Sequence, residues 1–327
     1  MHTHAKTLLP GTALLLVTLA IISLATGDIH LTPSQLWDGL LHNNTGNDAT
    51  LAINILWGMR IPRLIVTLLS GAALASSGLI MQAFFRNSLA SPGLIGVSAG
   101  ATTGAVCIIA LGLTTQSLFL LPAAAIAGAF ASTLLVMTLA RHGTSTERLL
   151  LSGVALNAML GAVTSYILSD SILSHERNAQ IIFWLLGGLE NRTWEHVVVA
   201  TPILLAAILL CPLGRPMDLL SLGTAEAQSL GVDVKRLQRH LLILSTILTA
   251  LATAVVGTVG FVGLIVPHIL RLLAGAEHRL LIPLSLLAGA TFMLACDIAS
   301  HFASNLRIGI VTAIIGGPFF LWLLQKK

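Results

Sequence analysis

Apolar runs of about 20 residues make up most of this sequence. A helix of about 20 apolar residues crosses the roughly 30 Å hydrocarbon core of a bilayer. Of the 327 residues, 55% are hydrophobic and only 9% are charged, so the chain lacks the polar residues that would cover a soluble domain of this size. We therefore expect an all-α, polytopic membrane protein whose residues 1–327 form a single transmembrane domain.

Nine apolar runs can be delimited, and the seventh is ambiguous. The runs cover residues 8–25, 64–84, 94–113, 118–140, 149–168, 197–213, 241–273, 280–299 and 308–324. With 33 residues, the seventh run is too long for one upright helix and short for two full spans. Its centre, Val256–Gly263, holds three glycines, which allow the chain to turn. The first run is longer than a signal-peptide core and lacks a convincing cleavage site, so we interpret it as a span.

The placement of Lys and Arg decides whether the seventh run counts once or twice. If it turns at its glycines, the chain has about ten transmembrane helices and both termini lie in the cytoplasm. In that case 12 of the 17 basic residues face the cytoplasm and 5 face outside. If the run crosses only once, the split becomes 9 to 8. Because cytoplasmic loops are normally enriched in Lys and Arg, ten spans are favoured.

Two arginines, Arg60 and Arg63, precede the second run on the outer side, where this topology leaves few basic residues. The planar guanidinium group binds a carboxylate through two parallel hydrogen bonds, so one interpretation is a docking site for an acidic partner. The alternative is that both arginines anchor the helix to lipid headgroups. The outer segment 28–60 that precedes them should also hold a short amphipathic helix starting near Thr32.

The longest polar segment on the cytoplasmic side covers about residues 214–239 and resembles two short helices separated by a glycine. Its apolar residues Leu219, Leu220, Leu222 and Leu230 are spaced for one helical face. That spacing favours a surface on which a partner docks, and a plain connector between spans is the alternative.

Several function classes lack their motifs in this chain. It has no P-loop for ATP hydrolysis, no paired acids or HExxH helix of a membrane hydrolase, no clustered His or Cys for a metal, and no basic-aromatic patch for nucleic acid. Asp297 is the exception in spans that hold almost no acids, and it is typical of a helix-packing or snorkelling carboxylate. A conduit driven by a separate protein fits these absences, and an ion-coupled secondary transporter is the alternative.

Seven segments carry a family resemblance. They are 60–63, 71–78, 81–82, 87–100, 150–155, 261–271 and 308–318. In order and spacing they resemble the permease subunits of FecCD-type ABC importers, which take up iron–siderophore complexes, haem and cobalamin. The resemblance implies the type II ABC importer fold in a bacterial inner membrane, with two copies of the permease and two ATP-binding subunits. Those subunits would bind ATP and Mg²⁺, so this chain would need no cofactor and would not be an enzyme.

The resemblance also implies a periplasmic substrate-binding protein that docks on the outer face. Arg60 and Arg63 match the arginines that pair with glutamates of that protein in the family. His301 stands where the cobalamin permease has a third docking arginine. Either Arg307, six residues on, takes over that role, or the docking uses fewer fixed charges.

Coupling and gate residues follow from the same resemblance. Contacts to the ATPase would come from Leu219, Leu220, Leu222, Gly223, Glu226, Leu230 and Gly231. The cytoplasmic gate would include Asn87, Leu89, Ser145 and Thr146, with small polar connecting loops as the alternative. The expected substrate is an iron chelate, most commonly a ferric siderophore in this family, with haem and cobalamin as alternatives. A heterodimer with a paralogous permease is the alternative to a homodimer.

Overall fold

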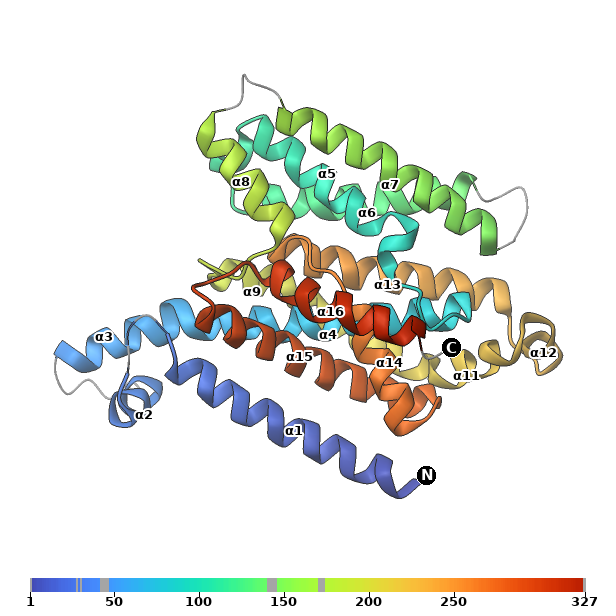
Figure 1. Ribbon diagram of the computed structural model, residues 1–327, viewed down its shortest axis with the longest axis horizontal. Coiled ribbons are helices and arrows are strands. Elements are labelled where there is room, and N and C mark those ends of the chain that lie inside the picture. Colours follow the sequence, from blue (N-terminus) through green and yellow to red (C-terminus); the bar gives the residue numbers. More distant parts are fainter. Residues whose placement is uncertain are drawn as a thin grey trace.

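The chain folds into a bundle of helices that run along one long axis (Figure 1). The computed structural model describes residues 2–27, 29, 31–41, 47–139, 146–169 and 174–325, and these described residues contain no strand. The α-helices are α1 (His2–Ala25), α2 (Pro33–Leu41), α3 (Asn47–Ile55), α4 (Ile61–Phe85), α5 (Val97–Ala110), α6 (Leu120–Leu139), α7 (Thr146–Ser169), α8 (His175–Leu186), α9 (Trp194–Ala200), α10 (Pro202–Leu210), α11 (Gly214–Leu222), α12 (Thr224–Ser229), α13 (Val234–Val256), α14 (Val262–Ala274), α15 (His278–Phe302) and α16 (Ile308–Gln325). A π-helical segment, Leu56–Arg60, joins α3 to α4, and short 3₁₀ turns cover Pro92–Ile95, Leu113–Thr115 and Cys211–Leu213.

The membrane-spanning elements agree with the ten spans expected from the sequence. Seven helical stretches of the described chain are long and apolar enough to cross a bilayer. Three shorter apolar helices, α5, α14 and α16, supply the remainder. Each of the ten corresponds to one predicted run once the seventh run is divided. The all-α polytopic fold is therefore confirmed.

The seventh run divides at its glycines, as predicted. Helix α13 ends at Val256 and α14 begins at Val262. Gly257 has a φ of 74°, a left-handed conformation that glycine adopts without steric cost. Phe261 has a φ of 67°, which is costly for a side chain with a Cβ. Its ring is accommodated by Gly316 of α16, where a Cβ would lie 2.2 Å from the ring.

Helix α4 forms the centre of the bundle and packs against α13, α14 and α15. Two glycine pairs allow these helices to approach closely. A Cβ on Gly71 would lie 2.3 Å from the carbonyl oxygen of Gly289 in α15, and one on Gly78 only 1.7 Å from that of Gly263 in α14. Small residues at helix crossings are typical of membrane bundles, where van der Waals packing rather than the hydrophobic effect holds helices together.

The second span begins earlier than predicted. The sequence suggested a span from Leu64 with a polar loop before it, whereas the helix is continuous from Asn47 through the π-helical segment to Phe85. Arg60 and Arg63 therefore project from a helix instead of standing at its mouth. The short helix predicted near Thr32 is present as α2, and Thr32 and Gln35 form the reciprocal hydrogen bonds of a capping box at its start.

The bundle has two distinct ends (Figure 1). Helix α1 begins and α16 ends at the same end as α11 and α12, which we call the hairpin end. The opposite end carries α2, α3, the start of α8 and the turn between α15 and α16. We call it the arginine end, because Arg60, Arg63, Arg192 and Arg307 lie there.

Candidate docking and coupling sites

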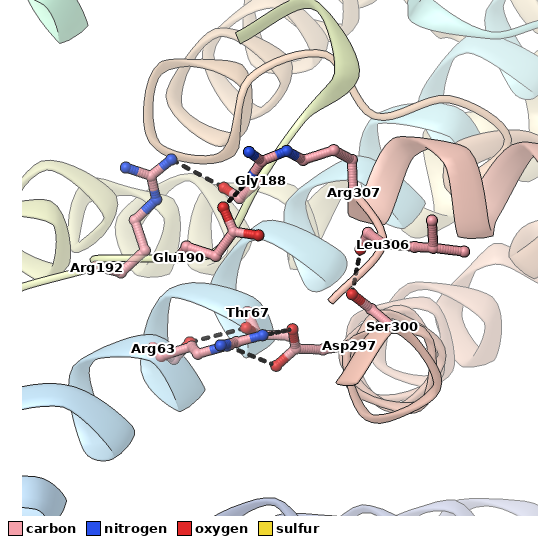
Figure 2. A network of polar contacts seen from close by, with 9 residues as sticks. All are labelled: Arg63, Thr67, Gly188, Glu190, Arg192, Asp297, Ser300, Leu306 and Arg307. Carbon is pink, nitrogen blue, oxygen red and sulfur yellow. Dashed lines mark hydrogen bonds and ion pairs between the residues drawn. The ribbon is translucent and has the colours of Figure 1, made fainter. Parts of the chain in front are cut away.

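Arg63 joins two helices at the arginine end. Its Nη2 donates to Oδ1 of Asp297 at 2.7 Å and its Nε to Oδ2 at 3.2 Å, which is a bidentate pair between α4 and α15 (Figure 2). The Asp297 side chain is only 5% exposed, whereas that of Arg63 is 23% exposed. The isolated acid in the ninth predicted span is therefore a helix-packing carboxylate. Its partner lies 234 residues away in the sequence.

Arg60 stabilises the carboxyl end of α1. Its guanidinium donates hydrogen bonds to the backbone carbonyls of Leu24 and Ile29. The last carbonyls of a helix lack partners within the helix and carry partial negative charge, so a cation there is favourable. Gly27 makes room for the guanidinium, since a Cβ at that position would lie 2.6 Å from Nη2 of Arg60.

Arg60, Arg63, Asp297 and His301 line one small cavity of about 170 Å³. The structure thus brings together three of the four residues that the sequence suggested for docking. Arg307 lies elsewhere at this end, paired with Glu190 and with its guanidinium 4.4 Å from the centre of the Phe183 ring. It is positioned by the turn after α15, which the Ser300 hydroxyl closes by donating to the carbonyl of Leu306 (Figure 2).

The sequence suggested no role for Arg192, which lies beside the pair of Arg307 and Glu190 (Figure 2). Its Nη2 donates to the carbonyl of Gly188 at 2.8 Å, and its Nη1 lies 3.1 Å from Nε2 of His196. Burial, with a smaller repulsion from Arg63, lowers the pKa of Arg192 to about 10. The sequence signal was its presence among the few outer basic residues, but the cavity that it lines also contains residues from distant segments, such as Ile109 and Arg307.

At the hairpin end, α11 and α12 project from the bundle as two short helices separated by Gly223, as predicted (Figure 1). Gly223 is buried with a φ of 145°, which only glycine adopts readily. The leucines do not share one helical face, because this glycine ends α11 before Leu230 is reached. Leu220 is buried, whereas Leu222 is 65% and Leu230 is 58% exposed.

The other residues proposed for coupling lie on the same projection. Glu226 and Gly231 are exposed and Leu219 is half-buried. The projection is attached to the bundle by Asp218 of α11. Its Oδ1 accepts a hydrogen bond from the backbone N–H of His278 at 2.7 Å and lies 2.7 Å from the Nδ1 of the same residue. Asp218 therefore caps the amino end of α15 from outside that helix.

A family model described as the FecCD transport family matches residues 14–326. The chain belongs to the FecCD transport family. The cobalamin import system permease protein BtuC of Halobacterium salinarum is 42% identical over 278 residues, which cover 84% of this chain and 74% of the relative. The hemin transport system permease protein HmuU of Yersinia pestis is 38% identical over 325 residues, covering 96% and 94%.

Two solved structures share the fold of this chain. One described as an inward-facing conformation of a metal-chelate type ABC transporter has a TM-score of 0.85 at 34% identity, covering 99% of this chain and 100% of that one. The structure of PsaBC from Streptococcus pneumoniae in complex with Fab shares the fold, with a TM-score of 0.60 at 18% identity. This FecCD chain is therefore a membrane-embedded permease of an ABC importer.

The gate residues predicted for the FecCD permease lie partly within the described chain. Asn87 and Leu89 follow α4, and the Asn87 side-chain oxygen accepts a hydrogen bond from the backbone N–H of Leu89 at 2.9 Å. Arg86, which ends the helix, is left-handed with a φ of 49°. Ser145 lies outside the described residues, and Thr146 is described only as the first residue of α7.

Proposed function

We propose that two copies of this chain form the membrane pathway of an ATP-driven importer that carries a large metal chelate into the cytoplasm. Two ATP-binding subunits, which themselves would bind ATP and Mg²⁺, would dock at the hairpin end. A periplasmic binding protein would dock at the arginine end. Both termini would then be cytoplasmic, consistent with the excess of Lys and Arg that the sequence places on that side. The FecCD family membership and the structural neighbour support this proposal.

The exposed leucines of the α11–α12 projection are the observation that carries the proposal. A polar segment that leaves Leu222 and Leu230 more than half exposed has apolar side chains that the chain itself does not cover. Short helices with exposed apolar anchors dock into grooves of partner proteins. An ATPase groove at this end would bury both leucines and let nucleotide-driven movements reach α15 through the contact between Asp218 and His278.

At the arginine end, Arg63 is the best candidate for docking. It is partly exposed and already binds one carboxylate, so its fork is oriented before a partner arrives. A glutamate of the binding protein would bind the guanidinium of Arg63 together with Asp297 or in place of it. Arg307 is also partly exposed and paired with a carboxylate, but it lies outside the cavity that Arg63 lines with Arg60 and His301. Arg60 would contribute mainly through its positive field, because its guanidinium binds backbone carbonyls of this chain.

We also propose that the substrate of this importer is an organic metal chelate. The relatives are named for cobalamin and hemin, the structural neighbour for a metal chelate, and the sequence resemblance suggested a ferric siderophore. All are organic chelates of one metal ion. We retain the ferric siderophore as the first candidate, with haem and cobalamin as the alternatives of the same class.

The test is a binding panel with the cognate binding protein, measured by calorimetry against a ferric siderophore set, haem and cobalamin. Tight binding of one chelate would identify the substrate, whereas binding of free amino acids or sugars alone would contradict the proposal. The mass of the purified complex distinguishes a homodimer from a pair with a second permease.

A further inference from the structure

A larger cavity of about 480 Å³ opens at the arginine end, separate from the one that holds Arg63. It is walled by the end of α5, the start of α6, α8, α9 and the end of α13. Its chemically notable lining residues are Gln180, Phe183, Trp184, Arg192, His196 and Arg307. The volume falls within the roughly 300–1,000 Å³ typical of ligand pockets.

Arg192 has no ion pair with a carboxylate among the described residues around this cavity. Arg307 is paired with Glu190, but Arg192 contacts only the Gly188 carbonyl and His196 among its described hydrogen-bond partners, and no carboxylate. The Nε of Arg192 is shielded from solvent and has no hydrogen-bond partner among the described residues. Glu176 also lines the cavity, and its side chain is exposed.

Arg192 is half-buried, and a guanidinium that has lost part of its water without gaining an opposite charge is costly. Arg192 nevertheless stays protonated at neutral pH, since its pKa of about 10 lies well above 7. The Cζ atom of Arg192 lies 5.6 Å from the centre of the Phe183 ring. This cation–π contact orients the guanidinium without neutralising it. The cavity therefore offers a positioned cation that pairs with no carboxylate of the part of the chain that the structure describes.

We propose that this cavity binds a carboxylate of the incoming chelate, with Arg192 as the charged donor and Phe183 and Trp184 as an apolar wall. The inference rests on the proposed function as a chelate importer and narrows its substrate class to chelates with an anionic edge. Arg307, in the turn between α15 and α16, adds a positive field but is itself ion-paired with Glu190 (Figure 2). The cavity lies at the end that faces the binding protein, so it receives the chelate before the membrane is crossed.

The experiment measures binding of haem, which carries two propionates, and of haem dimethyl ester to the full-length permease in lipid nanodiscs. Absorbance titrations are corrected with empty discs. A charge-assisted hydrogen bond contributes about 1.5–3 kcal/mol, so haem should bind at least about tenfold more tightly than the ester. In Arg192→Gln this preference should disappear, because the carboxylate loses its charged donor. Arg192→Lys should keep part of it, which shows that a loss in Arg192→Gln does not come from misfolding.

Arg239→Gln removes the same charge from an exposed position at the other end of the bundle and should bind like the wild type. Absence of haem binding to the wild type, equal binding of acid and ester, or an unchanged preference in Arg192→Gln would each overturn the proposal. The proposal would also be overturned if Arg192→Gln kept its affinity for haem and instead lost its affinity for the binding protein. Failure of the proposed function is seen separately, as absence of ATP-dependent uptake of every chelate by the wild-type transporter.

Discussion

The arginines proposed for docking all make bonds within the chain. Arg60 binds the carbonyl of Leu24 at the end of α1 and that of Ile29 beyond it, Arg63 binds Asp297, and Arg307 binds Glu190. Each side chain is thereby held in one orientation before any partner approaches, which reduces the entropy that docking must remove. The consequence for experiments is that replacing these residues changes the stability of the permease as well as its surface charge.

Arg63→Glu should destabilise the permease, because two carboxylates would face each other between α4 and α15. Breaking a buried ion pair costs about 3–5 kcal/mol, and partial exposure of Arg63 reduces this to about 2 kcal/mol. The measurement is the thermal unfolding midpoint of the purified permease. Arg63→Glu combined with Asp297→Arg should recover most of the loss by restoring the pair in reverse.

The reversed pair also separates stability from docking. If Arg63 contacts a glutamate of the binding protein, the double variant should fold like the wild type and still bind that protein at least about tenfold more weakly. Unchanged affinity in the well-folded double variant would return Arg63 to a purely structural role. A double variant no more stable than Arg63→Glu would contradict the pairing itself.

The crossing of α4 and α14 depends on Gly78. Gly78→Ala should lower stability by about 1–3 kcal/mol, because the added methyl group collides with the Gly263 carbonyl and pushes the helices apart. Gly161→Ala in α7 is the matched control. Its Cβ meets no atom within 4 Å, so improved helix propensity should leave stability equal or slightly higher.

Both glycine variants are compared by thermal unfolding in detergent and by uptake in the assembled transporter. Equal midpoints for the two variants would show that α4 and α14 are not in close contact at Gly78 and Gly263.

The α11–α12 projection separates docking from folding within one short segment. Leu222→Ser and Leu230→Ser together should weaken binding of the ATPase by at least about tenfold while leaving the unfolding midpoint of the permease unchanged. Leu220→Ser should instead destabilise the permease by about 2 kcal/mol or more, because Leu220 is 1% exposed. Co-purification with the ATPase and thermal unfolding measure the two effects. A double variant that retains the ATPase would remove the exposed leucines from the docking surface.

The sequence predicted the elements well where a simple physical rule applied. Run length and charge bias gave the ten spans, and the glycines between Val256 and Gly263 marked the break between α13 and α14. The helix before Leu64 was missed. The polar residues of segment 28–60 suggested a loop, whereas tertiary contacts of Trp57 with Gly39 and Trp194 hold the segment Leu56–Arg60 against the bundle.

The candidate sites were predicted less completely. A lone acid in an apolar span implied a buried partner, but nothing in the sequence linked Asp297 to Arg63. Arg192 was missed for the same reason, since its cavity is assembled from five separate helices and the turn before α16. Leucine spacing suggested one apolar face around Gly223, and the φ of 145° at that glycine shows why this interpretation was wrong.

One helix connects the two ends of the molecule. Helix α15 begins at His278, which contacts Asp218 of the projection, and near its other end Asp297 holds Arg63. At 1.5 Å per residue its 25 residues span about 37 Å, close to the thickness of a membrane. The proposed partners on opposite faces would therefore contact residues attached to the same rigid element.

The most direct measurement is uptake of the chelate selected by the binding protein into proteoliposomes that contain the permease and its ATPase. We predict uptake that requires ATP and the binding protein, persists when ionophores collapse the proton gradient, and stops when the Walker lysine of the ATPase is replaced. The permease alone should move no chelate. Sustained gradient-driven uptake by the permease alone would contradict the assignment and favour an ion-coupled transporter.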